Sequence, residues 1–198
     1  MNTELEEKKY FVVRDVLSKD VLELVKYYMT IKFGVQYDFK NSVGKFAPAS
    51  GVPDVVQPCS IYSYADAVTE SLLIMLNPLM KEVTQKPDLE CTYSFVRLYE
   101  RGQWLEKHSD RPACQYSITL PLCASTDEPW TIFVDGQPVD LAVGDLVVYK
   151  GCEAKHWREP LEQEYQIQAH LHYVDGADPA YQPYIYDERD TIGRKKNA

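Results

Sequence analysis

The stretch RLYERGQWLEKHSD, residues 97–110, ends in two side chains that can bind a transition metal. His108 and Asp110 are separated by one residue, so both project to the same side if a strand continues through them. A second histidine, His156, follows later in the chain, where a returning strand can bring it back beside the first. Two imidazoles and one carboxylate can occupy one face of a ferrous ion and leave other positions open. The pattern therefore predicts an Fe(II) site formed by His108, Asp110 and His156.

The composition predicts one globular domain and narrows its partners. The chain has 198 residues, of which 45% are hydrophobic, enough for a substantial core. The formal net charge of -9 argues against binding to the phosphate backbone of nucleic acids. The longest apolar run, residues 72–76, is too short to cross a membrane. No C-x-x-C pair occurs among the five cysteines and no apolar leader opens the chain, so we expect reduced thiols and a cytoplasmic location.

The first third of the sequence predicts supporting structure. Residues 10–13 form a candidate strand, and Ser18 can cap a following helix. The apolar residues of that helix recur at helical spacing: Leu17, Val21, Leu24, Val25 and Tyr28. Residues 34–62 contain several glycines and prolines, which predicts a long loop. Such a loop is either a lid over a site or an irregular surface crossing, and the sequence does not decide between them.

A second helix is predicted between this loop and residue 91. Ser63 is its candidate N-cap, and its apolar residues are Leu72, Leu73, Leu76 and Leu79. Asn77 can cap a restarted helix with Pro78 at its first position, or Pro78 can kink one continuous helix.

From residue 91 the pattern changes to short segments rich in β-branched and aromatic residues. These predict strands at 92–99, 115–122, 131–134, 139–143, 145–149, 155–159 and 164–174. Such spacing is typical of a mainly β jelly roll, a double-stranded β-helix, here behind N-terminal helices. We expect a single domain with helical support over about 10–90, a jelly-roll core over about 91–174 and a C-terminal tail over 175–198.

The predicted strand at 164–174 alternates in polarity. Gln166, Gln168, His170 and His172 share one side, and the residues between them are mostly apolar. This alternation predicts a strand with one face toward a cavity and the other face packed in the core. We expect His170 and His172 to support the metal site from outside, because the set of three metal ligands is already complete.

The residues around the metal pattern resemble the Fe(II)/2-oxoglutarate-dependent dioxygenases of prolyl-4-hydroxylase type. Tyr99-Glu100-Arg101-Gly102 precedes His108-Ser109-Asp110 in the way that Tyr-x-x-Gly precedes His-x-Asp in that family. Gly144-Asp145 before His156 is similar to the family's Gly-Asp strand, and residues 10–18 resemble the start of such domains. The resemblance implies an enzyme with Fe(II), 2-oxoglutarate and O₂. It would hydroxylate a C–H bond and convert 2-oxoglutarate to succinate and CO₂.

The chain departs from the family at the cation that binds the C5 carboxylate of 2-oxoglutarate. The family usually has Arg or Lys about ten residues after the distal histidine, where this sequence has Gln166. Arg158 shares a predicted strand face with His156 and is a candidate replacement. Arg97 is a second candidate. The other candidate cosubstrate contacts are Gln166, Tyr93 and Tyr116, of which the two tyrosines can equally be core aromatics.

Two other functions remain open at this point. A cupin-type metal protein that does not use 2-oxoglutarate would explain the missing cation at Gln166, and a non-catalytic binding module could retain the fold. The sequence predicts no catalytic residue beyond the metal ligands. It does not identify the substrate, which could be a small molecule or a protein side chain such as prolyl, and it does not reveal the oligomeric state.

Overall fold

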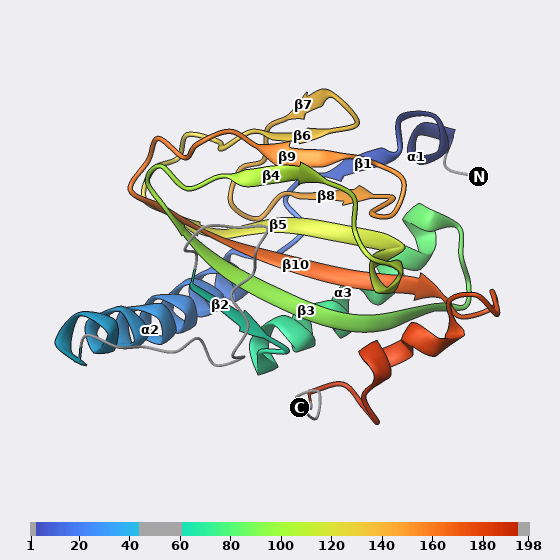
Figure 1. Cartoon of the computed structure of the whole chain (residues 1–198), viewed down its shortest axis with the longest axis horizontal. Coiled ribbons are helices and arrows are strands. Elements are labelled where there is room, and N and C mark those ends of the chain that lie inside the picture. The colour runs from blue at the N-terminus through green and yellow to red at the C-terminus, as the bar shows by residue number, and fades with distance from the viewer. Residues whose placement is uncertain (1–2, 44–60, 194–198) are drawn as a thin grey trace.

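The structure, a computed structural model, describes residues 3–43 and 61–193. Its strands form two antiparallel sheets (Figure 1). The larger sheet has the order β1-β8-β5-β10-β3-β2, and the smaller sheet has the order β4-β9-β6-β7. The strands are β1 Tyr10–Val13, β2 Ile61–Tyr64, β3 Leu89–Glu100, β4 Leu105–His108, β5 Tyr116–Ala124, β6 Ile132–Val134, β7 Gln137–Val139, β8 Leu146–Tyr149, β9 His156–Arg158 and β10 Tyr165–Asp175.

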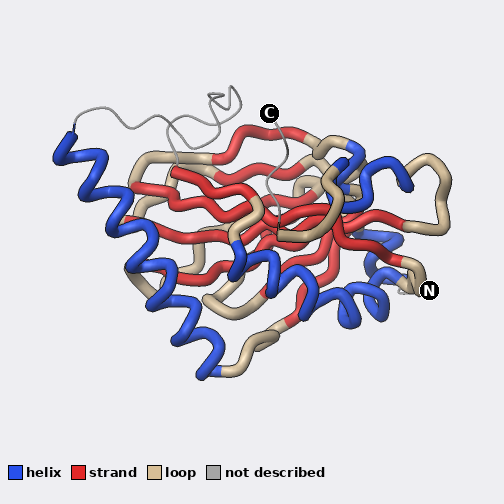
Figure 2. Tube along the Cα trace, turned by 90° about the horizontal axis from the view of Figure 1, so that it is seen from below, coloured by secondary structure: helices blue, strands red, loops and turns tan. Residues whose placement is uncertain are grey.

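The two long helices, α2 and α3, lie on one side of the larger sheet (Figure 1). Helices α2 and α3 cover the outer face of the larger sheet, and the smaller sheet lies on its other side (Figures 1 and 2). The helical segments are α1 Thr3–Lys8, α2 Lys19–Val43, α3 Ala67–Thr84, η1 Pro112–Cys114 and η2 Gln182–Glu188. No helix within the described ranges is long and apolar enough to cross a membrane. The described cysteines, Cys91, Cys114, Cys123 and Cys152, are all free thiols.

Strand β10 separates the apolar core from the polar interior. Ile167, Ala169 and Leu171 belong to the core that α2 and α3 close. His170 and His172 point to the opposite side and line a cavity between the sheets. The alternation predicted from the sequence is therefore confirmed, because successive strand residues face opposite sides of a sheet.

Helix α2 begins as predicted and continues further than predicted. The Ser18 hydroxyl accepts a hydrogen bond from the Val21 amide at 3.4 Å, as an N-cap does. The helix then runs through Gly34 to Val43, so the predicted loop is wrong over residues 34–43. One glycine costs a helix only about 1 kcal/mol, which the flanking turns can offset. Residues 44–60 of the predicted loop lie outside the described residues.

Helix α3 differs from prediction at its start, and its middle matches one of the two predicted alternatives. Asp66 is the N-cap, and its carboxylate accepts hydrogen bonds from the amides of Val68 and Thr69. Ser63, the predicted cap, lies in β2 instead. Of the two alternatives for Asn77 and Pro78, the structure has the single continuous helix, which contains Pro78, and not a restart at Asn77.

The predicted strands of the β region are confirmed with one exception. The segment 139–143 is not a strand beyond Val139, because β7 ends there and the chain turns toward Asp145. The Asp145 carboxylate accepts from the amides of Asp15 and Ala142 and pairs with Arg14 at 2.6 Å. These contacts fix the segment after β1 to the start of β8, which pairs with β1.

Candidate metal centre

Three side chains converge where the smaller sheet faces the larger one. His108 ends β4 and pairs in register with His156, the first residue of β9. The Nε2 atoms of His108 and His156 lie 3.6 and 3.5 Å from Oδ1 of Asp110. Asp110 lies beyond the end of β4, so the strand does not continue through it as expected, yet its carboxylate reaches the same point. The structure thus brings together the ligand set predicted from the sequence.

Both imidazoles are oriented by backbone carbonyls. The Nδ1 atom of His108 lies 2.6 Å from the Glu106 carbonyl oxygen, and that of His156 lies 3.1 Å from the Ala154 carbonyl oxygen. A carbonyl oxygen only accepts, so each Nδ1 carries the proton. The Nε2 lone pairs are then directed toward Asp110, as a metal-binding histidine requires.

The Asp110 carboxylate is divided between two roles. Its Oδ2 accepts a hydrogen bond from the Ser117 hydroxyl at 2.9 Å, which leaves Oδ1 facing the two histidines. The Asp110 amide donates to the Gly151 carbonyl at 2.8 Å. A Cβ at Gly151 would lie 2.3 Å from the Cys114 carbonyl oxygen and 2.5 Å from Asp110 Oδ2. Only glycine therefore fits beside this carboxylate.

The electrostatics favour an ionised carboxylate at Asp110. Burial tends to raise the pKa of Asp110, but the contacts with His108 and His156 hold it well below its usual range. His172, whose Nδ1 lies 2.9 Å from the Ser117 hydroxyl, has its pKa lowered by burial to about 4. Ser117 thus connects a neutral buried imidazole to the carboxylate of the metal site.

A cavity of about 290 Å³ opens at this point. Both sheets contribute to its walls, together with the segment after β4. The lining residues are Tyr64, Tyr93, Phe95, Arg97, Leu105, His108, Asp110, Arg111, Tyr149, His156, His170 and His172. Two arginines among them make the cavity favourable for anions in a chain whose net charge is negative.

Arg158 is a buried cation whose hydrogen-bonding capacity is largely unused. Its side chain shares the face of β9 with His156, and both residues are only 2% exposed. One Nη1–H donates to the Trp130 carbonyl, and the guanidinium lies over the Trp130 ring, with Cζ 4.6 Å from the ring centre. Its Nε and Nη2 atoms have no partner among the described residues. Burial lowers the pKa of Arg158 to about 10, so it remains charged at neutral pH.

Further unpartnered polar atoms lie on the facing strand, β10. Among the described residues, neither side-chain polar atom of Gln168 has a hydrogen-bond partner, and the same holds for Nε2 of His170. Gln168 is fully buried, and its position on β10 turns it toward the interior. Buried polar groups without partners are uncommon in folded proteins, so this part of the interior is suited to a polar ligand.

The other predicted cosubstrate residues have different positions. Tyr93 and Arg97 line the cavity. Gln166 is buried, but its side-chain Oε1 already accepts a hydrogen bond from the side-chain Nε2 of Gln163 at 3.1 Å. Tyr116 is not brought to the cavity, because it lies in the apolar core on the other face of the larger sheet. Ser117 of β5 reaches the site through its hydrogen bond to Asp110, and the only pattern that could have indicated it is the alternation of strand residues.

Comparison with known proteins gives a consistent fold at low sequence identity. No family model and no curated protein matches the sequence. A prolyl-4-hydroxylase from Pseudomonas putida is 16% identical, with a TM-score of 0.59 over 86% of this chain and 95% of that chain. A prolyl hydroxylase from Trichoplax adhaerens, solved with a peptide fragment of hypoxia inducible factor, is 12% identical, with a TM-score of 0.64 over 90% and 89%. The α-ketoglutarate-dependent epimerase SnoN of nogalamycin biosynthesis is 13% identical, with a TM-score of 0.63 over 88% and 81%.

These likenesses define a class of fold. The chain has the fold of the 2-oxoglutarate- and Fe(II)-dependent oxygenases that include the prolyl hydroxylases. This is the class that the sequence resemblance implied.

Proposed function

We propose that this protein is an Fe(II)- and 2-oxoglutarate-dependent oxygenase that hydroxylates a C–H bond. Its two sheets would form the jelly roll of that class, with the metal between them. The observation that carries the proposal is the buried guanidinium of Arg158, whose Nε and Nη2 have no described partner. It shares one strand face with the metal ligand His156. A buried cation beside a metal site calls for an anion, and 2-oxoglutarate supplies one at each end.

The residues of the site fit Fe(II). Two imidazole nitrogens and one carboxylate oxygen lie within 4.8 Å of one another. This donor set contains no thiolate and suits ferrous iron. The carbonyls behind both histidines and Ser117 behind Asp110 hold the three donors in position.

The interior also fits 2-oxoglutarate. Arg158 would bind the C5 carboxylate through its Nε and Nη2 edge, which forms two parallel hydrogen bonds with a carboxylate. The amide of Gln168 and Nε2 of His170 would supply further hydrogen bonds along the ligand. Arg158 therefore replaces the cation that the family usually has at the position of Gln166.

Iron and 2-oxoglutarate together supply the O₂ chemistry, in which 2-oxoglutarate is converted to succinate and CO₂. The protein holds the reactants in place and keeps water out. Leu105 and Tyr149 line the cavity beside the metal site, and the hydrogen bond from Ser117 orients the Asp110 carboxylate. The substrate would enter on the side of Tyr64 and Arg111. A prolyl or other amino-acid side chain is one candidate substrate.

An anaerobic titration tests this proposal. Fe(II) and 2-oxoglutarate added together should produce the weak visible charge-transfer band of the chelate. His108→Ala should abolish the band, whereas Lys107→Ala, which changes an exposed neighbour, should retain it. A wild-type protein that gives no band would contradict the proposed function.

A further inference from the structure

Arg111 has an unusual position for a half-exposed arginine. It follows the metal ligand Asp110 directly and lines the same cavity as the three ligands. Its side chain is 46% exposed, so it can be reached from solvent. A half-exposed arginine in the cavity wall beside the metal ligands can contact a molecule that binds there.

The guanidinium of Arg111 is held from two sides. Its Nη1 forms an ion pair with Oδ1 of Asp187 at 2.7 Å, and its Cζ lies 4.6 Å from the centre of the Tyr93 ring. No partner of its Nε or Nη2 occurs among residues 3–43 and 61–193. The Nε and Nη2 hydrogens form the edge of a guanidinium that matches a planar carboxylate. Arg111 is thus fixed in place with one carboxylate-binding edge to spare.

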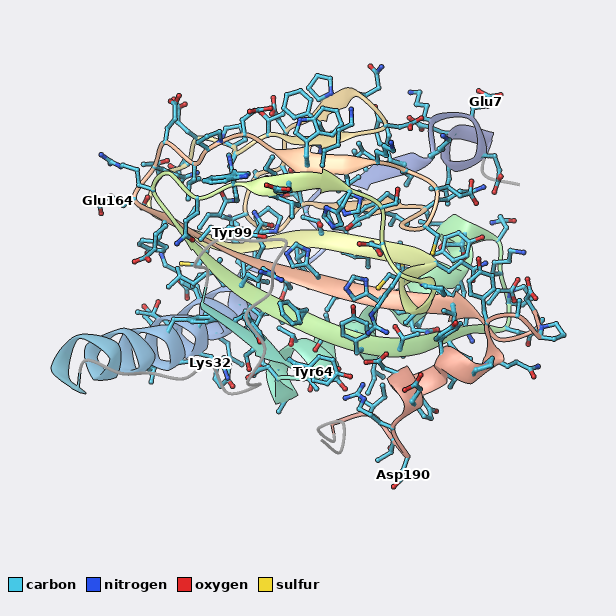
Figure 3. All side chains as sticks on the ribbon, in the orientation of Figure 1. Glu7, Lys32, Tyr64, Tyr99, Glu164 and Asp190 are labelled. Carbon is cyan, nitrogen blue, oxygen red and sulfur yellow. The ribbon has the colours of Figure 1, made fainter. Side chains whose placement is uncertain are left out.

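The segment that carries Asp187 is built to hold this contact. Asp187 is buried, and its Oδ2 also accepts a hydrogen bond from the Tyr64 hydroxyl at 2.6 Å. Tyr64 points toward this C-terminal segment (Figure 3). Tyr186, Asp187 and Glu188 have φ values of 54°, 55° and 62°, in the left-handed region that side chains disfavour. Such strain persists only where the surrounding structure enforces it, and it concentrates at functional sites.

Arg189 provides that enforcement. Its guanidinium donates to the carbonyls of Tyr186 and Thr92 at 2.8 Å each and pairs with the buried Glu70 at 3.2 Å. The strained turn is therefore anchored to both β3 and α3. A solvated surface arginine would not need a buried carboxylate presented in this way.

The surrounding charges favour an anionic substrate group. Arg97 lines the same cavity and adds a second positive charge. The Asp110 carboxylate faces the histidines and Ser117, so it does not compete with an incoming carboxylate for Arg111. An incoming carboxylate would meet the Arg111 edge with its aliphatic or aromatic part near Tyr93 and Tyr64.

We propose that Arg111 determines specificity by binding a carboxylate of the primary substrate, a small carboxylic acid whose C–H bond is thereby placed beside the metal. Asp187 is the positioning residue for Arg111. The inference rests on the proposed oxygenase function for its chemistry, but the carboxylate site itself can be tested without turnover.

The test compares N-acetyl amino acids with the corresponding N-acetyl amino-acid amides, which differ only in the carboxylate. Binding is measured as a shift of the Fe(II)–2-oxoglutarate band, and separately as a rise in the melting temperature of the metal-free protein. We expect at least one acid to bind roughly tenfold more tightly than its amide, the gain of a charge-assisted hydrogen-bonded pair. Arg111→Gln should remove this preference, and Asp187→Asn should weaken it.

Asp127→Asn is the charge-matched control, because Asp127 is exposed and lies in the loop after β5. It should retain the preference of the wild-type protein for acids. Equal binding of acids and amides, no binding of either, or a preference that survives Arg111→Gln would overturn the proposal. If the wild type gives no band but acids still raise its melting temperature, the oxygenase function fails while the Arg111 site stands.

Discussion

Arg158 and Arg189 are both buried arginines, but they have opposite hydrogen-bonding states. Arg189 pairs with Glu70 and donates to two backbone carbonyls. Arg158 donates to one carbonyl and leaves Nε and Nη2 without a described partner. Both are less than a tenth exposed.

This difference in hydrogen bonding distinguishes a structural arginine from one that we propose binds a ligand. Burying a charge is costly unless other groups compensate it, and Arg189 finds that compensation within the protein. Arg158 finds no such compensation among the residues that the structure describes, which is why we propose that an anionic ligand provides it. The same reasoning applies on β10, where Gln166 is hydrogen-bonded and Gln168 has no partner within the described ranges.

Removal of Arg189 should have the largest effect of all, a decrease in the free energy of unfolding. Arg189→Met leaves the buried Glu70 carboxylate without its cation, and breaking a buried pair in this way typically costs about 3–5 kcal/mol. We expect a loss of this size in the free energy of unfolding, measured by urea denaturation. A loss below about 1 kcal/mol, which is typical of an exposed ion pair, would show that Arg189 is not a structural arginine. The contrast with Arg158 would then fail.

Ser117→Ala tests the support behind the metal ligand. The change leaves Asp110 Oδ2 without its hydrogen bond and frees the carboxylate to rotate. Loss of such an orienting contact typically lowers metal affinity about 10- to 100-fold, which we expect for Mn(II) binding measured by calorimetry. Ser109→Ala, next to the same ligand but exposed, is the control and should bind Mn(II) normally.

His172 should make the metal-free protein sensitive to acid. Its pKa of about 4 in the folded protein lies below its usual 6.5, so between these values the unfolded chain binds a proton that the folded chain does not. Stability must therefore fall as the pH falls from 6.5 to 4. In His172→Asn this decline should be shallower by up to about 1.4 kcal/mol per pH unit. Identical slopes in denaturation series across this range would contradict the assignment.

Arg158→Met should have the smallest effect on stability and the opposite sign from Arg189→Met. The variant removes a buried charge that forms no ion pair with a carboxylate among the residues that the structure describes. Replacing buried charged groups with apolar ones is often neutral or stabilising. We expect a gain of up to about 1 kcal/mol in the unfolding free energy without ligand. A clear loss would mean that Arg158 is a structural residue after all.

The sequence predicts what depends on local patterns. The two faces of β10 follow from alternation, and the structure confirms them. The spacing predicts three ligands, and the structure places their side chains together. Of its two alternatives, Tyr116 takes that of a core aromatic, since neighbouring strand residues face opposite sides of the sheet and Ser117 faces the site. The N-cap of α3 was assigned to Ser63 instead of Asp66, because both residue types can cap and only the end of β2 decides. Asp187 carried no sequence signal, because its role depends on contacts with Arg111 and Tyr64, both distant in the chain.

The affinity for 2-oxoglutarate of the Mn(II)-loaded protein, measured by calorimetry in the wild type and in Arg158→Met, tests the central claim most directly. Two charge-assisted hydrogen bonds are removed, so we expect binding to weaken about 100-fold. Mn(II) affinity should not change, because Arg158 is not a metal ligand. Wild-type affinity for 2-oxoglutarate in Arg158→Met would show that the buried guanidinium does not bind the cosubstrate and would contradict the account.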